Sequence, residues 1–148
     1  METSRRAGPL HVLLIEDSEA DIDLIRTAFG EMQRSHSPVE LHVARDGAQA
    51  RAALASDPRI ALVLLDGGLP DEDGLHWLAS LKAHEDVSLR RLPVVMLSGS
   101  DTEEQIRGAY HAHASAYLIK PSDPDGLRQM VGALVQFWGQ VARLPNRL

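Results

Sequence analysis

The chain has 148 residues and a mass of 16.2 kDa, which is the usual size of one domain and too small for two. It contains no cysteine, which excludes disulfides, thiolate metal sites and cysteine nucleophiles and fits a reducing compartment. The net charge of -6 argues against nucleic-acid binding, because surfaces that bind phosphates are normally basic. No apolar run approaches the ~20 residues needed to span a bilayer. We therefore expect a cytoplasmic protein that binds neither nucleic acid nor a membrane.

Apolar runs of strand length alternate five times with stretches of helical periodicity. We expect strands at residues 10–15, 39–44, 60–65, 92–97 and 115–119. The third run is apolar throughout, which is typical of a strand buried on both faces, whereas the second alternates as an edge strand does. The pattern predicts an α/β fold with a doubly wound, five-stranded parallel sheet and helices on both faces. Residues 1–9 are expected to be a disordered lead-in, and residues 10–144 to form the domain.

Capping residues mark where the helices between these strands begin. Ser18 is expected to cap the first helix and Asp46 to open the second, and a third helix is expected after Asp73 and Gly74. Ser100 and Glu103 form a capping-box pattern for the fourth. A long fifth helix is expected at about residues 123–143.

The last helix carries two apolar stripes, although one stripe is enough to dock a helix on a sheet. The first stripe contains Leu127, Met130, Leu134, Phe137 and Val141, and the second contains Val131, Val135, Trp138 and Ala142. A deeply packed helix would explain both. The alternative is that the second stripe is a partner interface anchored by Trp138.

Polar side chains follow four of the five expected strands, at the edge where ligands bind in doubly wound sheets. Glu16 and Asp17 follow the first strand, Asp66 the third, Ser98 the fourth and Lys120 the fifth. Each residue alone is more often a cap, a turn residue or a solvated group. All of them on one edge of one sheet indicate a functional site.

The residue types at this edge suit phosphoryl chemistry. Clustered carboxylates repel one another unless a cation lies among them, and Mg²⁺ accepts such oxygen ligands. Asp66 is the candidate nucleophile, Lys120 the point cation and Ser98 a hydroxyl donor. Gly67 and Gly99 are places where backbone amides can approach a phosphoryl group closely.

Histidines offer no comparable signal. The sequence has seven, and none is spaced from another in a way that suggests a zinc site. His111 and His113 are two residues apart, where side chains of a helix diverge, so we interpret them as surface residues.

The combined motifs resemble the receiver domain of bacterial two-component response regulators. They are residues 12–17 (VLLIED), 64–70 (LLDGGLP), 73–74 (DG), 93–99 (PVVMLSG) and 116–121 (AYLIKP). The resemblance covers nearly the whole chain. It implies the flavodoxin-like receiver fold, with strand order 2-1-3-4-5 and five helices, and a role in phosphorelay signalling rather than enzyme catalysis.

The resemblance also implies roles for individual residues. Asp66 would accept a phosphoryl group from a histidine kinase. Mg²⁺ would be held by Asp17 and Asp66 directly, by Glu16 through water and by the backbone carbonyl of Gly68.

A second group of residues would report phosphorylation. Ser98 and Tyr117 would form a switch, and the bond between Lys120 and Pro121 would be cis, which proline makes affordable.

A further resemblance lies near the C-terminus. Residues 90–95 (RRLPVV), 137–138 (FW) and 141–145 (VARLP) are similar to those of the small response regulators that partner bacterial phytochromes. Those regulators are single receivers that form homodimers through the last helix and strand. The resemblance implies a phytochrome kinase as partner and a signal that leaves through a protein surface, since no output domain is expected.

The sequence departs from the family pattern in two places. Gly67 and Gly68 replace bulkier residues, and His113 stands where glycine is common.

Three alternative functions remain. A receiver-like binding module that is never phosphorylated is one alternative. A flavin-binding carrier is another, but residues 16–19 (EDSE) would repel phosphate. An aspartate-nucleophile phosphohydrolase is the third, but Gly68 stands where its second aspartate would be.

Overall fold

The computed structural model describes residues 8–33 and 38–147, so the expected lead-in lies almost wholly outside the described residues. Five strands form one sheet: β1 (Leu10–Ile15), β2 (Val39–Ala44), β3 (Ile60–Asp66), β4 (Val94–Ser98) and β5 (Ala116–Ile119). Neighbouring strands pair in parallel in the order β2-β1-β3-β4-β5. The predicted fold class and strand order are confirmed, and β2 is an edge strand as its alternation indicated.

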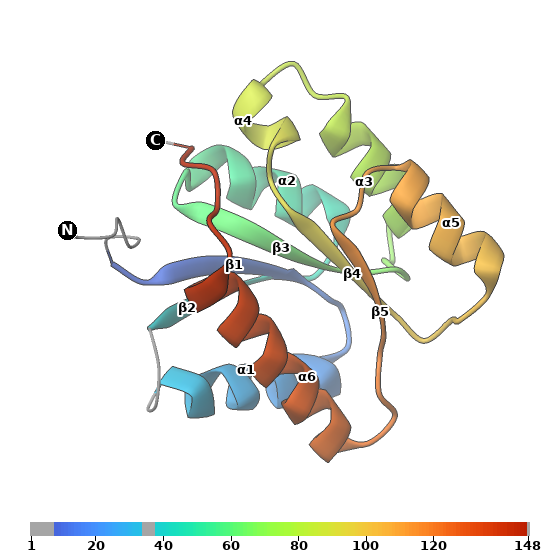
Figure 1. Cartoon of the computed structure of the whole chain (residues 1–148). Helices are drawn as coiled ribbons and strands as arrows, with labels where there is room; N and C mark the ends of the chain where they lie inside the picture. The colour runs from blue at the N-terminus through green and yellow to red at the C-terminus, as the bar shows by residue number, and fades with distance from the viewer. Residues whose placement is uncertain (1–7, 34–37, 148) are drawn as a thin grey trace.

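Helices cover both faces of the sheet (Figure 1). They are α1 (Glu19–Gln33), α2 (Gly47–Ser56), α3 (Gly74–Lys82), α4 (Val87–Arg90), α5 (Glu103–His111) and α6 (Pro124–Gln136), with the π-helical turn η1 (Phe137–Val141) after α6. α1 and α6 pack on one face, and α2 to α5 lie on the other. The described residues contain six α-helices rather than the expected five, because α4 is a single turn capped by Asp86 and is too short for helical periodicity to reveal.

The helix starts follow the predicted caps with one exception. The side chain of Ser18 accepts a hydrogen bond from the amide of Asp21, and Asp46 and Asp73 cap α2 and α3. α5 is capped by Thr102 rather than Ser100, so the capping-box interpretation is wrong by two residues. Ser100 instead bonds to Ser98 of β4 and Tyr117 of β5, as described below.

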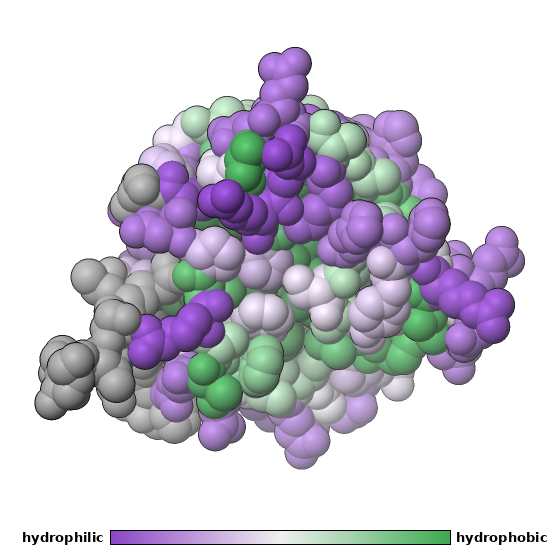
Figure 2. All heavy atoms as spheres, turned by 45° about the horizontal axis from the view of Figure 1, so that its top comes forward, coloured by the Kyte–Doolittle hydropathy of each residue, from purple (hydrophilic) through white to green (hydrophobic). Residues whose placement is uncertain are grey.

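The sheet divides the core into two apolar layers, because successive side chains of a strand point to opposite faces. In the first layer, Val12 and Leu14 of β1 pack with α1 and α6. In the second layer, Leu13 and Ile15 pack with α2 and α3. Trp77 of α3 is 1% exposed in the second layer, where its indole N–H donates to the carbonyl of Gly47 at 3.1 Å. On the face seen in Figure 2, apolar residues form separate areas among hydrophilic side chains. None of the described helices is both long and apolar enough to cross a membrane.

The end of the last helix differs from the prediction. Val131 and Val135 are 0% and 2% exposed inside the first apolar layer, and Trp138 packs against it, so the second stripe does not form an exposed face. Phe137 and Val141 of the first stripe are instead 49% and 65% exposed. The α-helix ends at Gln136, and a π turn contains more residues per turn than an α turn, so it rotates the side chains that follow out of the preceding stripe.

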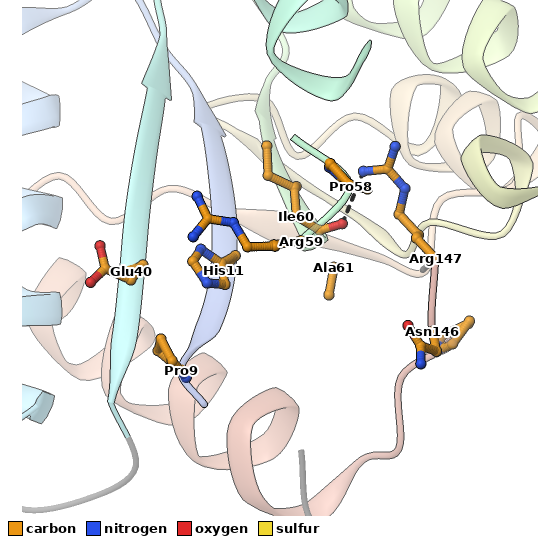
Figure 3. A pocket seen from close by; sticks show the side chains of 10 residues that line it. Pro9, His11, Glu40, Pro58, Arg59, Ile60, Ala61, Asn146 and Arg147 are labelled. Carbon is orange, nitrogen blue, oxygen red and sulfur yellow. Dashed lines mark hydrogen bonds between the residues drawn. The ribbon is translucent and has the colours of Figure 1, made fainter. Parts of the chain in front are cut away.

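Residues 142–147 return as an extended segment toward the amino ends of the strands. Leu144 packs against the first apolar layer. The guanidinium of Arg147 donates to the carbonyls of Leu54, Asp57 and Ile60 at 2.9, 3.2 and 3.1 Å. The segment is thus fastened to the loop between α2 and β3 (Figure 3).

His113 occupies the turn between α5 and β5 with a φ of 71°, in the left-handed region that favours glycine. The family resemblance led us to expect glycine at this position. L-residues pay roughly 1–2 kcal/mol for this conformation, and part of that cost is recovered because glycine loses more entropy on folding.

We expect His113→Gly to raise the free energy of unfolding by up to about 1 kcal/mol, measured by urea denaturation. The control His111→Gly alters the last residue of α5, where glycine has no conformational advantage, and should lower stability. Equal effects of the two variants would contradict the strain argument.

Candidate phosphoryl-acceptor and metal site

Three carboxylates meet at the carboxyl edge of the sheet. The register places Ile15 of β1 beside Leu65 of β3, so the residues that follow these two come together. Ligand oxygens of Glu16, Asp17 and Asp66 lie within 4.8 Å of one another. Glu16 is 1% exposed and Asp17 is exposed, so the cluster extends from the core to the surface.

Lys120 lies among these carboxylates, directly after β5. Its ammonium nitrogen is 2.7 Å from Glu16 Oε1, 2.9 Å from Asp21 Oδ2 and 3.5 Å from Asp66 Oδ1. Its amide donates to the carbonyl of Ser98 at 2.7 Å, which fixes the position of the backbone.

Asp21 is a site residue that the sequence analysis missed. It lies in the first turn of α1, four residues after Asp17, where the general acidity of residues 16–23 concealed it. Its place in the first turn of the helix that directly follows Glu16 and Asp17 is the signal that could have identified it.

The electrostatics of the site are set by burial. Burial raises the pKa of Glu16, and the charge of Asp66 acts in the same direction, against the hydrogen bond from Lys120. Burial alone would lower the pKa of Lys120, but its hydrogen bonds with Glu16 and Asp21 and the charge of Asp66 raise that pKa above the usual value. Lys120 therefore remains an ammonium ion at neutral pH.

The donor set fits a hard divalent cation. Mg²⁺ and Mn²⁺ are typically bound by carboxylate oxygens with water in the remaining positions, and this cluster offers oxygens only. Glu16, Asp17 and Asp66 would hold such an ion. Gly68 is exposed in the following loop, which a β-bridge to Asp73 closes.

The two backbone positions expected to receive a phosphoryl group differ in their surroundings. Gly99 is exposed at the end of β4. The amide of Gly67, in contrast, donates to the carbonyl of Leu97 at 3.2 Å and so extends the sheet ladder. That amide is already paired, which the sequence did not predict.

The loop that contains Gly67 and Gly68 is anchored beyond these glycines. The carboxylate of Asp71 accepts hydrogen bonds from the amides of Gly47 and Ala48, at 2.8 and 3.1 Å, at the start of α2. Glu72 forms an ion pair with Arg51 at 2.6 Å. The loop is therefore tied to α2 despite its two flexible residues.

Ser100 connects the two expected switch residues. Its amide donates to Ser98 Oγ at 3.1 Å, and its carbonyl accepts a hydrogen bond from the Tyr117 hydroxyl at 2.7 Å. Ser98 is buried and Tyr117 half-buried. The amide of Tyr117 also donates to the hydroxyl of Tyr110 at 3.3 Å.

The bond between Lys120 and Pro121 is trans, contrary to what the resemblance implies. No cis peptide bond occurs in residues 8–33 or 38–147. Both isomers of a bond before proline are close in energy, so the local sequence does not decide between them.

With this fold and site in place, comparison with known proteins identifies the class. Residues 12–132 match the family model of the response regulator receiver domain, and the chain belongs to this family.

Similar relatives include a phytochrome response regulator. The response regulator Rcp1 of Synechocystis is 36% identical over 93% of this chain and 94% of its own length. The structure of its Mn²⁺-bound form superposes with a TM-score of 0.80 over 93% of this chain and 99% of that one. The phosphorylated cyanobacterial phytochrome response regulator RcpA is 37% identical, with a TM-score of 0.84 over the same shares.

We expect Lys120→Met to lower the free energy of unfolding by about 3–5 kcal/mol at neutral pH without divalent ions, because a buried anionic cluster loses its cation. The decrease in unfolding free energy caused by Lys120→Met should become smaller as the pH falls. A carboxyl whose folded pKa is raised, as that of Glu16 is, favours the folded state increasingly as it becomes protonated. Urea denaturation at neutral and mildly acidic pH measures both effects.

Lys82→Met is the matched control. Lys82 is also half-buried, but its ammonium donates to the carbonyls of Arg90 and Leu92 rather than to carboxylates. Removal of Lys82 leaves no unpaired charge. The decrease in unfolding free energy caused by Lys82→Met should therefore stay constant over the same acid range. A parallel pH dependence of the two variants would contradict the charge-balance argument.

Proposed function

We propose that this chain is a response regulator that accepts a phosphoryl group on Asp66 from a histidine kinase. The observation that carries the proposal is the position of Lys120, whose ammonium reaches Asp66, Glu16 and Asp21 at the edge where Asp17 also lies. The constellation supplies an accepting carboxylate, further oxygen ligands for a cation and a fixed positive charge. Membership of the receiver family supports the same assignment.

The chemistry follows from these positions. A carboxylate oxygen of Asp66 forms a bond to phosphorus while the bond from phosphorus to the kinase histidine breaks, and the imidazole leaves as the neutral ring after taking up a proton. Lys120 is 3.5 Å from Asp66 Oδ1 and neutralises charge on the transferred group. A divalent ion, when bound at Glu16, Asp17 and Asp66, supplies additional positive charge to the phosphoryl oxygens. The Mn²⁺-bound form of Rcp1 supports this choice of cation class, and Mg²⁺ is the ion we propose.

Ser100 offers a route by which phosphorylation changes the surface. A phosphoryl group that recruits the hydroxyl of Ser98 competes with the Ser98–Ser100 hydrogen bond. Ser100 also holds the hydroxyl of Tyr117 through its carbonyl. Movement of residue 100 therefore releases Tyr117, and we propose this as the link between Asp66 and the face formed by β5 and α5.

The partner kinase that we propose is a phytochrome. The support comes from RcpA, a phytochrome response regulator, and from Rcp1, both about equally similar to this chain. Mixing the protein with a phosphorylated candidate kinase and following loss of label from the kinase tests the pairing. Transfer to this protein that is no faster than from an unrelated kinase would refute the phytochrome assignment alone.

We expect acetyl phosphate with Mg²⁺ to retard the protein in a phosphate-affinity gel, and Asp66→Asn to abolish the retardation. Asp101→Asn is the control, since Asp101 is an exposed carboxylate after the same sheet edge and should remain without effect. Retardation that survives Asp66→Asn would sink the acceptor assignment. No retardation of the wild type would favour the alternative of a receiver-like module that phosphorylation does not regulate.

We also propose a homodimer formed through the last strand and helix, now with different anchor residues. Phe137 and Val141 of η1 and Ile119 of β5 are large apolar residues with 49%, 65% and 45% of their surface exposed. Exposed apolar side chains of this size favour burial by a partner. Phe137 also packs edge-on against Trp138, with ring centroids 5.0 Å apart, so it is held in place for contact.

The double variant Phe137→Ser with Val141→Ser is expected to convert the dimer to a monomer, measured by light scattering at micromolar concentration. Val87→Ser is the control, because Val87 is 40% exposed on the distant α4. A wild-type monomer under these conditions would overturn the dimer proposal. Trp138→Ala is less suitable, since Trp138 contacts the core and its loss would destabilise the fold.

A further inference from the structure

The structure brings together two histidines that lie 31 residues apart in the sequence. His11 of β1 and His42 of β2 project from the α2 face of the sheet, and His11 Nδ1 is 3.0 Å from His42 Nε2. The carboxylate of Asp57, at the C-terminal end of α2, lies 4.0 Å from the same His42 nitrogen. The three ligand atoms all lie within 4.8 Å of one another.

We infer that His11, His42 and Asp57 form a second metal site, specific for a zinc-class divalent ion and separate from the carboxylate site. Two imidazoles and one carboxylate are a donor set that Zn²⁺ prefers and Mg²⁺ does not. Zn–N bonds of about 2.0–2.1 Å in a tetrahedral site place two ligand nitrogens about 3.3 Å apart. The observed separation of 3.0 Å is close to this value.

The surroundings of the two histidines suit an ion that takes the position of the proton now shared between their rings. One imidazole now donates to the other, and metal binding requires that proton to move to the second nitrogen of the same ring, with no net release. His11 is 8% exposed, and burial, reinforced by the charge of Arg59, lowers its pKa, so that its ring is neutral at pH 7. A neutral ring is the form that binds a metal.

An access path and a competitor are also present. His11 lines a cavity of about 450 Å³ together with Arg59 and Arg147, and this cavity opens the site to small ions (Figure 3). Arg59 holds the carboxylate of Asp57, with contacts of 2.9 Å to each oxygen. The Arg59 side chain is 58% exposed, so it is free to turn toward solvent when an ion takes one oxygen of Asp57.

The test is titration of the full chain with Zn²⁺, and with Co²⁺ as a spectroscopic probe, in excess Mg²⁺ to occupy the carboxylate site. We expect one bound ion whose affinity falls at least about tenfold in His42→Gln, which keeps a hydrogen-bonding group opposite His11. His111→Gln, at an exposed histidine elsewhere, should leave the affinity unchanged. The Co²⁺ absorption spectrum should show tetrahedral intensity in the wild type and lose it in His42→Gln.

Arg59→Ala is expected to increase the affinity for Zn²⁺, and a misfolded variant would not show that increase. Removing the cation that holds Asp57 should tighten Zn²⁺ binding, and the thermal midpoint in Zn²⁺ should rise further above that of the metal-free protein. Equal Zn²⁺ affinity in the wild type and His42→Gln would overturn the inference, and so would weaker binding in a folded Arg59→Ala variant. Either result would leave His11 and His42 as a hydrogen-bonded pair within the sheet.

Discussion

The arrangement of the site depends on the ion pairs between the ammonium group of Lys120 and the carboxylates around it. Glu16, Asp21 and Asp66 come from the end of β1, from α1 and from β3, and their negative charges converge on one partly buried point. Hydrophobic packing brings these elements together, and their carboxylates would repel one another there without a cation. The sheet order makes the balance possible, because β5 delivers Lys120 along the same edge as β1 and β3. The carboxylates of the candidate site therefore oppose the fold that positions them.

Much of the fold was predictable because each strand carries its own signal. The all-apolar β3 and the alternating β2 identified a central and an edge strand, and the polar residues after the strands indicated the site. Single turns and side-chain directions were not predictable in this way. The π turn at Phe137, where Phe137 and Val141 are exposed, was not predictable, since no propensity distinguishes it from the α-helix before it. Asp21 was hidden among neighbouring acids, and its role became visible through its contact with Lys120.

The same limitation explains why the histidine pair escaped sequence analysis. Metal motifs are recognised by short spacings within one element, whereas His11 and His42 meet only after β1 and β2 pair in register. They point toward α2 because a strand alternates its side chains, which also places them opposite the first apolar layer. The two groups of potential ligands differ in hardness, with oxygens alone in one and imidazole nitrogens in the other. The proposed histidine site would therefore favour a different class of divalent ion from the carboxylate site.

The hydrogen bonds of Arg147 affect the order in which parts of the protein fold during synthesis. Its guanidinium satisfies carbonyls at residues 54, 57 and 60, about 90 positions earlier in the chain. During synthesis, the junction of α2 and β3 must wait for that side chain until almost all of the domain has left the ribosome, because domains are made from the N-terminus onward. The early strands can associate beforehand, but the closure of this corner is a late event that follows translation of the last helix.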